Sequence, residues 1–116
     1  MNARDESYFM FTFLAHLTHD YFNNAGHADR PVHDLFDKLF KNNMMKNTVI
    51  LFFADHGLRF GPIRRTHSGE IEARLPFMFI YLPETMETYK HIMEQNQYRL
   101  VTPFDIDATM FHIVEG

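Results

Sequence analysis

The chain has 116 residues, of which 46% are hydrophobic, and its net charge is −4. This length fits one compact domain or part of a larger one, and the apolar content excludes a disordered chain. The charge provides no polybasic surface for nucleic acid, the lack of cysteine excludes a thiolate zinc site, and the apolar runs are too short for a membrane segment.

The first half of the sequence predicts a strand followed by a helix. Residues 8–17 (YFMFTFLAHL) are rich in aromatic residues and long enough for a strand that is buried on both faces. The hydrophobic period then changes, because apolar residues recur at the spacing of one helix face (Val32, Leu35, Phe36, Leu39 and Phe40). Asp29 is the predicted N-cap of this helix, and Pro31 suits its first turn.

The second half predicts two strands separated by a long polar loop, and then two helices. Residues 47–54 (NTVILFFA) and 76–82 (PFMFIYL) are the strands, and residues 57–74 form the loop. A short amphipathic helix is expected around 86–93. A C-terminal helix is expected to begin at Pro103, with Thr102 and Asp105 as its cap and Gly116 as its stop. Strands that alternate with helices indicate an α/β fold with a mostly parallel sheet covered by helices on both faces.

Asp55 and His56 follow the strand at 47–54 directly, and Gly57 releases the chain there. Ligands of open α/β sheets bind beyond the carboxyl ends of strands. A carboxylate oxygen and an imidazole nitrogen at this place suit a divalent cation such as zinc or, less readily, calcium. The alternative is an ordinary turn in which Asp55 accepts backbone hydrogen bonds.

Several sequence blocks resemble one protein family. NTVILFFADHG resembles the strand and metal motif of sulfatases and of their phosphatase and phosphotransferase relatives in the alkaline-phosphatase superfamily. GLRFGPIRRTHSGEIEARLPFMFIYLP and RLVTPFDIDATMFHI resemble a sulfatase-like branch found in animals and catalogued as a domain of unknown function. The resemblance runs from about Phe9 to the last residue and implies part of an alkaline-phosphatase/sulfatase-like sandwich.

The resemblance also implies roles for individual residues. Asp55 and His56 match the metal ligands of the family, with zinc or calcium left open as the ion. His19, in the block THDYFN, matches a histidine that faces the substrate anion or a second metal, and Asp20 is a weaker candidate. Arg64 matches a recurrent arginine of this branch, and a guanidinium can bind sulfate or phosphate oxygens bidentately.

The other charged residues of the 57–74 loop leave alternatives open. Arg59, Arg64 and Arg65 can equally pair with Glu70 and Glu72 on a solvated loop. His67 is a weak candidate metal ligand. The block Glu72 to Pro76 matches a family motif expected to hold the loop against the next strand, with Ala73 in place of a second acidic residue.

Residues 1–116 are therefore predicted to be the C-terminal part of a sulfatase-like catalytic domain, with the rest of that domain upstream. The family's nucleophile lies before the matched region, so no catalytic residue is expected in this chain. The predicted function is part of a metal-dependent hydrolase of sulfate or phosphate esters, inactive alone. A non-catalytic pseudo-enzyme or binding module and a phosphotransferase are the alternatives. The resemblance places the protein in the secretory pathway or outside the cell.

Overall fold

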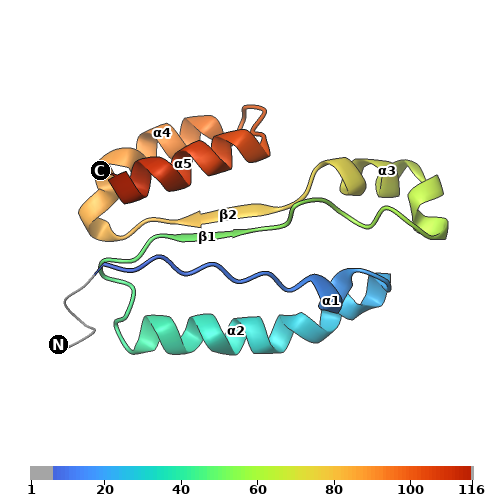
Figure 1. Cartoon of the computed structure of the whole chain (residues 1–116), viewed down its shortest axis with the longest axis horizontal. Coiled ribbons are helices and arrows are strands. Elements are labelled where there is room, and N and C mark those ends of the chain that lie inside the picture. Colours follow the sequence, from blue (N-terminus) through green and yellow to red (C-terminus); the bar gives the residue numbers. More distant parts are fainter. Residues whose placement is uncertain (1–6, 116) are drawn as a thin grey trace.

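A computed structural model describes residues 7–115 and places helices on both sides of two paired strands (Figure 1). The elements in chain order are α1 (Ala15–Thr18), the 3-10 turn η1 (Phe22–Asn24), α2 (Ala25–Lys41), β1 (Ile50–Phe53), η2 (Pro62–Arg65), α3 (His67–Arg74), β2 (Met78–Tyr81), η3 (Glu84–Tyr89), α4 (Lys90–Asn96) and α5 (Pro103–Glu115).

The two strands pair antiparallel, so the prediction of a mostly parallel α/β sandwich is wrong. Ile50 lies opposite Tyr81 and Phe53 opposite Met78, and the N–H of Ala54 extends the ladder with a 3.1 Å bond to the carbonyl of Phe77. A parallel pair needs a crossover that carries the chain back to the start of the first strand. Here α3 turns the chain at the end of β1, so β2 returns in the opposite direction (Figure 1).

The strand predicted at residues 8–17 is also absent from the structure. Residues 7–14 form no sheet ladder, and Ala15–Thr18 form the short helix α1. Aromatic side chains favour extended backbone, but a strand exists only where a neighbouring strand satisfies its N–H and C=O groups. Within the described residues β1 and β2 pair only with each other, and Tyr8 is 75% exposed.

The helix α2 begins earlier than the sequence predicted. Its N-cap is Asn24 rather than Asp29, so Pro31 lies inside the helix instead of in the first turn. Proline has no N–H to donate, which removes one intrahelical hydrogen bond at this position. The predicted apolar face is nevertheless the face that contacts the rest of the molecule, because Phe36 and Phe40 both meet aromatic rings of the strands.

The cap of the C-terminal helix α5 is confirmed. The backbone N–H and the hydroxyl of Thr102 both donate to the carboxylate of Asp105, at 2.8 and 2.6 Å. These bonds hold the pKa of Asp105 below its ordinary value, the side-chain bond being the larger cause. The predicted stop at Gly116 lies outside the described residues.

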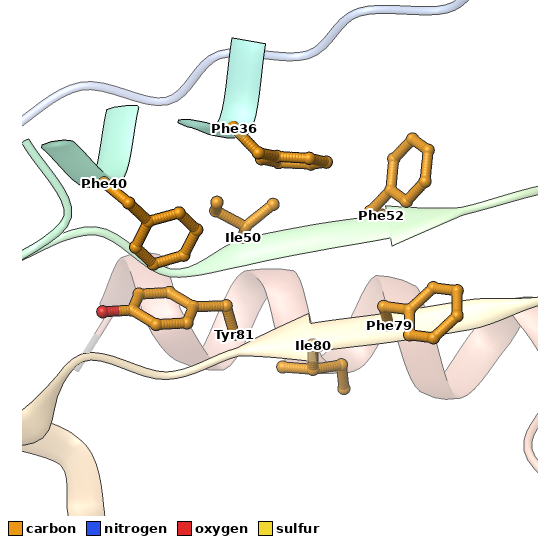
Figure 2. A pocket seen from close by; sticks show the side chains of 7 residues that line it. All are labelled: Phe36, Phe40, Ile50, Phe52, Phe79, Ile80 and Tyr81. Atoms are coloured by element: carbon orange, nitrogen blue, oxygen red, sulfur yellow. The ribbon is translucent and has the colours of Figure 1, made fainter. Parts of the chain in front are cut away.

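Aromatic rings join α2 to one face of the strand pair (Figure 2). Phe36 meets Phe52 at a centroid distance of 5.6 Å, and Phe40 meets Tyr81 at 5.0 Å, both edge to face. Together with Ile50 and Phe79 these side chains line an open apolar groove. In Figure 1, α4 and α5 lie on the side of the strands away from α2.

Little of the apolar surface is covered. Within the described residues Met45 and Ala73 are the buried hydrophobic side chains, while Phe79 is 64% exposed. The accessible surface is 10405 Å², whereas a compact monomer of this mass exposes about 6,600 Å². The chain therefore presents far more apolar surface than a self-sufficient core would leave.

Candidate metal and anion site

Asp55 and His56 follow β1 after one residue, Ala54, and their side chains face each other. The ladder ends where Ala54 bonds to Phe77, and the chain bends at Asp55. A carboxylate oxygen of Asp55 (Oδ2) lies 3.4 Å from Nε2 of His56. Two ligands that each lie about 2.0–2.4 Å from one small divalent cation are separated by roughly this distance.

The ring nitrogens of His56 have different surroundings. Nδ1 lies 2.8 Å from the carbonyl oxygen of Gly57. A carbonyl oxygen only accepts, so this contact places the proton of the neutral ring on Nδ1. The lone pair of Nε2 is then free and faces the Asp55 carboxylate. Histidines that bind metals commonly donate their other ring N–H to a backbone carbonyl in this way.

The bond expected for an ordinary turn is present as well. The other carboxylate oxygen of Asp55 (Oδ1) accepts a 3.0 Å hydrogen bond from the backbone N–H of His56. It uses the oxygen that does not approach Nε2. The backbone bond therefore fixes the carboxylate and leaves its second oxygen facing the imidazole.

Two other pairs of adjacent His and Asp residues provide a comparison. His19 approaches Asp20 at 2.7 Å and His33 approaches Asp34 at 3.2 Å, in both cases through Nδ1. The His33 bond, and after it the bond from Arg30, hold the pKa of Asp34 below its ordinary value. In these two pairs the carboxylate is the hydrogen-bond partner of Nδ1, a place that the carbonyl of Gly57 occupies at His56, so the Asp55–His56 geometry is not a general consequence of adjacency.

The predicted substrate histidine does not join this pair. Within the described residues, no group of three or more His, Asp or Glu side chains is placed to hold a metal ion. His19, which follows α1, and His67, the first residue of α3, therefore form no larger cluster with Asp55 and His56. The role predicted for His19 stays a prediction.

Arg64 lies in η2, half-buried, on the segment that follows the Asp55–His56 pair. The alternative expectation paired the loop arginines with Glu70 and Glu72. Glu70 instead forms a 2.9 Å ion pair with Arg74, one helical turn further on. Over residues 7–115 no ion pair involves Arg64, so its guanidinium donors are not committed to a carboxylate.

The segment predicted as a loop contains a helix that touches the site. The N–H of Gly57 donates to the carbonyl of Ala73 in the last turn of α3, at 3.3 Å. At the other end of α3, Thr66 caps the helix by accepting the N–H of Gly69 at 3.0 Å. The sequence signal was available: Thr66 precedes Glu70 in the first turn, and Glu70 and Arg74 have the spacing of a helical ion pair.

Comparison with known proteins decides the family. A family model described as a protein of unknown function, DUF229, matches residues 1–116. The chain belongs to the DUF229 family. Searches of curated proteins and of solved structures gave no match. No helix that the structure describes in this DUF229 chain is long and apolar enough to cross a membrane.

Proposed function

We propose that this chain contributes the metal and anion-binding part of a metal-dependent hydrolase of sulfate or phosphate esters. The observation that carries the proposal is the free Nε2 of His56 beside Oδ2 of Asp55, 3.4 Å away. One imidazole and one carboxylate fit zinc, and the same donors accept calcium less readily. A divalent cation held there would act as a Lewis acid toward an ester oxygen.

The anion-binding role rests on Arg64. Its guanidinium can donate two parallel hydrogen bonds to a sulfate or phosphate group, and no ion pair in the described part of the chain competes for them. The link to sulfatases comes from the sequence blocks around Asp55 and Arg64. That resemblance also supports the proposal of a protein in the secretory pathway or outside the cell.

Two ligands make an incomplete catalytic centre. Within the described residues no third His, Asp or Glu completes a metal site. We therefore propose that the nucleophile and the further acidic ligands come from polypeptide outside residues 7–115. By this proposal the 116-residue chain binds metal weakly and hydrolyses nothing by itself.

A zinc titration followed by NMR of the histidine side chains tests the metal site. We expect the resonances of His56 to respond at millimolar zinc or below, and Asp55→Asn to weaken this response at least tenfold. The matched control is Asp34→Asn. Asp34 is also adjacent to a histidine, but its carboxylate is bonded to Nδ1 of His33 and does not face a free Nε2. Equal responses of His33 and His56 to zinc would reject a dedicated site.

An ester assay tests the second part of the proposal. Aryl sulfate and aryl phosphate esters, with zinc or calcium, should not be turned over by the isolated chain. Metal-dependent turnover that disappears in Asp55→Ala would show instead that these residues carry a complete centre. The same assay on a longer natural form of the protein, which would supply the missing ligands, tests the pseudo-enzyme. If that form binds zinc but stays inactive, the pseudo-enzyme is favoured.

A further inference from the structure

Two glycines press against backbone at opposite ends of α3. A methyl group added to Gly57 would overlap the carbonyl oxygen of Glu72 and would lie 2.9 Å from Cα of Ala73. A methyl group added to Gly69 would overlap the carbonyl oxygen of Ile63. Backbone atoms cannot move aside as the end of a flexible side chain can, so neither position has room for a Cβ.

Hydrogen bonds reinforce both contacts. Gly57 donates its N–H to the carbonyl of Ala73 at 3.3 Å. At the other end, the hydroxyl of Thr66 donates to the carbonyl of Ile63 at 2.7 Å and accepts the N–H of Gly69 at 3.0 Å. The last turn of α3 is thus bonded to the residue after His56, and its first turn to the residue before Arg64.

We propose that α3 fixes the position of Arg64 relative to the Asp55–His56 pair, with Gly57 and Gly69 as the positioning residues. An eight-residue helix is a rigid body about 12 Å long. Because it is in backbone contact at both ends, a displacement at one end is transmitted to the other. The functional part of this inference rests on the proposed function, whereas the contact itself is tested without any ligand.

The proposed contact predicts that Gly69→Ala destabilises α3, whereas helix propensity alone predicts that it stabilises the helix. Alanine is the better helix former, so Gly69→Ala in an unconstrained helix would stabilise it. Gly26, inside α2, provides the matched substitution, because beyond its own turn of helix no atom lies within 4 Å of the place that an added methyl group would take. The same substitution, glycine to alanine, should therefore stabilise α2 at Gly26 and destabilise α3 at Gly69.

Amide hydrogen exchange measures the proposed coupling. We expect Gly69→Ala to accelerate exchange of the Gly57 amide at least tenfold, and Gly26→Ala to change it less than twofold. Thr66→Val, which replaces the capping hydroxyl by a methyl group, should accelerate it as well and serves if Gly69→Ala does not fold. Unchanged exchange at Gly57 in a folded Gly69→Ala or Thr66→Val variant overturns the inference.

A second measurement tests the consequence for the site. In the wild-type chain, zinc should raise the affinity of Arg64 for inorganic sulfate, read from its Nε–H resonance. Thr66→Val should keep the zinc response of His56 but reduce this gain at least fivefold; an undiminished gain counts against the inference. If zinc leaves the resonances of His56 in the wild type unchanged, the proposed function fails. The amide exchange of Gly57 still decides whether α3 couples the segment at Gly57 to the segment at Ile63.

Discussion

Phe36 of α2 meets Phe52 of β1 edge to face, with ring centroids 5.6 Å apart and ring planes at 83°. This contact crosses from the helix to the strand that ends at Phe53, two residues before Asp55, so it ties the helix layer to the segment that carries the candidate site. Edge-to-face aromatic pairs add about 0.5–1.5 kcal/mol beyond the burial of their area.

Phe52→Ala should therefore destabilise the chain measurably. We expect a loss of about 2 kcal/mol in the free energy of unfolding in urea, less than for a fully buried ring because Phe52 is half-buried. Phe104→Ala, which truncates a ring that is 86% exposed, should change it by less than about 0.5 kcal/mol. A double-mutant cycle of Phe36 and Phe52 that shows no coupling would contradict the contact.

Replacement of Arg64 should affect oxyanion binding selectively. Arg64→Lys keeps the charge but loses the planar pair of donors, so we expect sulfate affinity in the presence of zinc to fall about tenfold. Arg59→Lys, on an exposed position of the same segment, is the control and should change it less than twofold. Equal losses for both variants would mean that the segment attracts anions only through its net charge.

The uncovered apolar face should make the isolated chain self-associate. Light scattering after size exclusion should show a mass that rises with concentration, because the groove and the strand edges remain open. Phe79→Glu should reduce association, whereas Tyr98→Glu, at an even more exposed ring outside the groove, should not. A monomer that melts in one cooperative transition at all concentrations would contradict this expectation.

The cap of α5 should make its first turn sensitive to acid. The folded pKa of Asp105 is lowered by its bonds to Thr102, so the stabilisation is complete above the unfolded pKa of about 3.9 and is lost as the pH falls through the lower folded value. Asp105→Asn should accelerate amide exchange in the first turn of α5 at pH 7.

In strong acid the two proteins should become alike, because both then lack the carboxylate charge. The control is Asp107→Asn, since the side chain of Asp107 is not among the hydrogen-bonded groups of the described residues. An Asp105→Asn effect that persists unchanged below the folded pKa would show that the carboxylate charge is not what stabilises the cap.

Local patterns in the sequence predicted the elements whose stability is local. The strands around β1 and β2 and the helix α5 were found because apolar runs and the cap formed by Thr102 and Asp105 depend on neighbours in the chain. The adjacency of Asp55 and His56 after a strand was readable for the same reason. The helix α3 was missed although its cap and its Glu70–Arg74 spacing are local, because its polar surface was interpreted as a loop.

What the sequence determined by itself is the periodicity, the capping and the order of the donor groups, all of which are set by residues within a few positions of one another. Tertiary structure alone decided that β2 runs antiparallel to β1 and that residues 7–14 have no strand partner. It also decided that Gly57 packs against the backbone of Ala73. Strand direction and close backbone approach depend on how distant segments return in space, and hydrophobic patterning carries no information about that path.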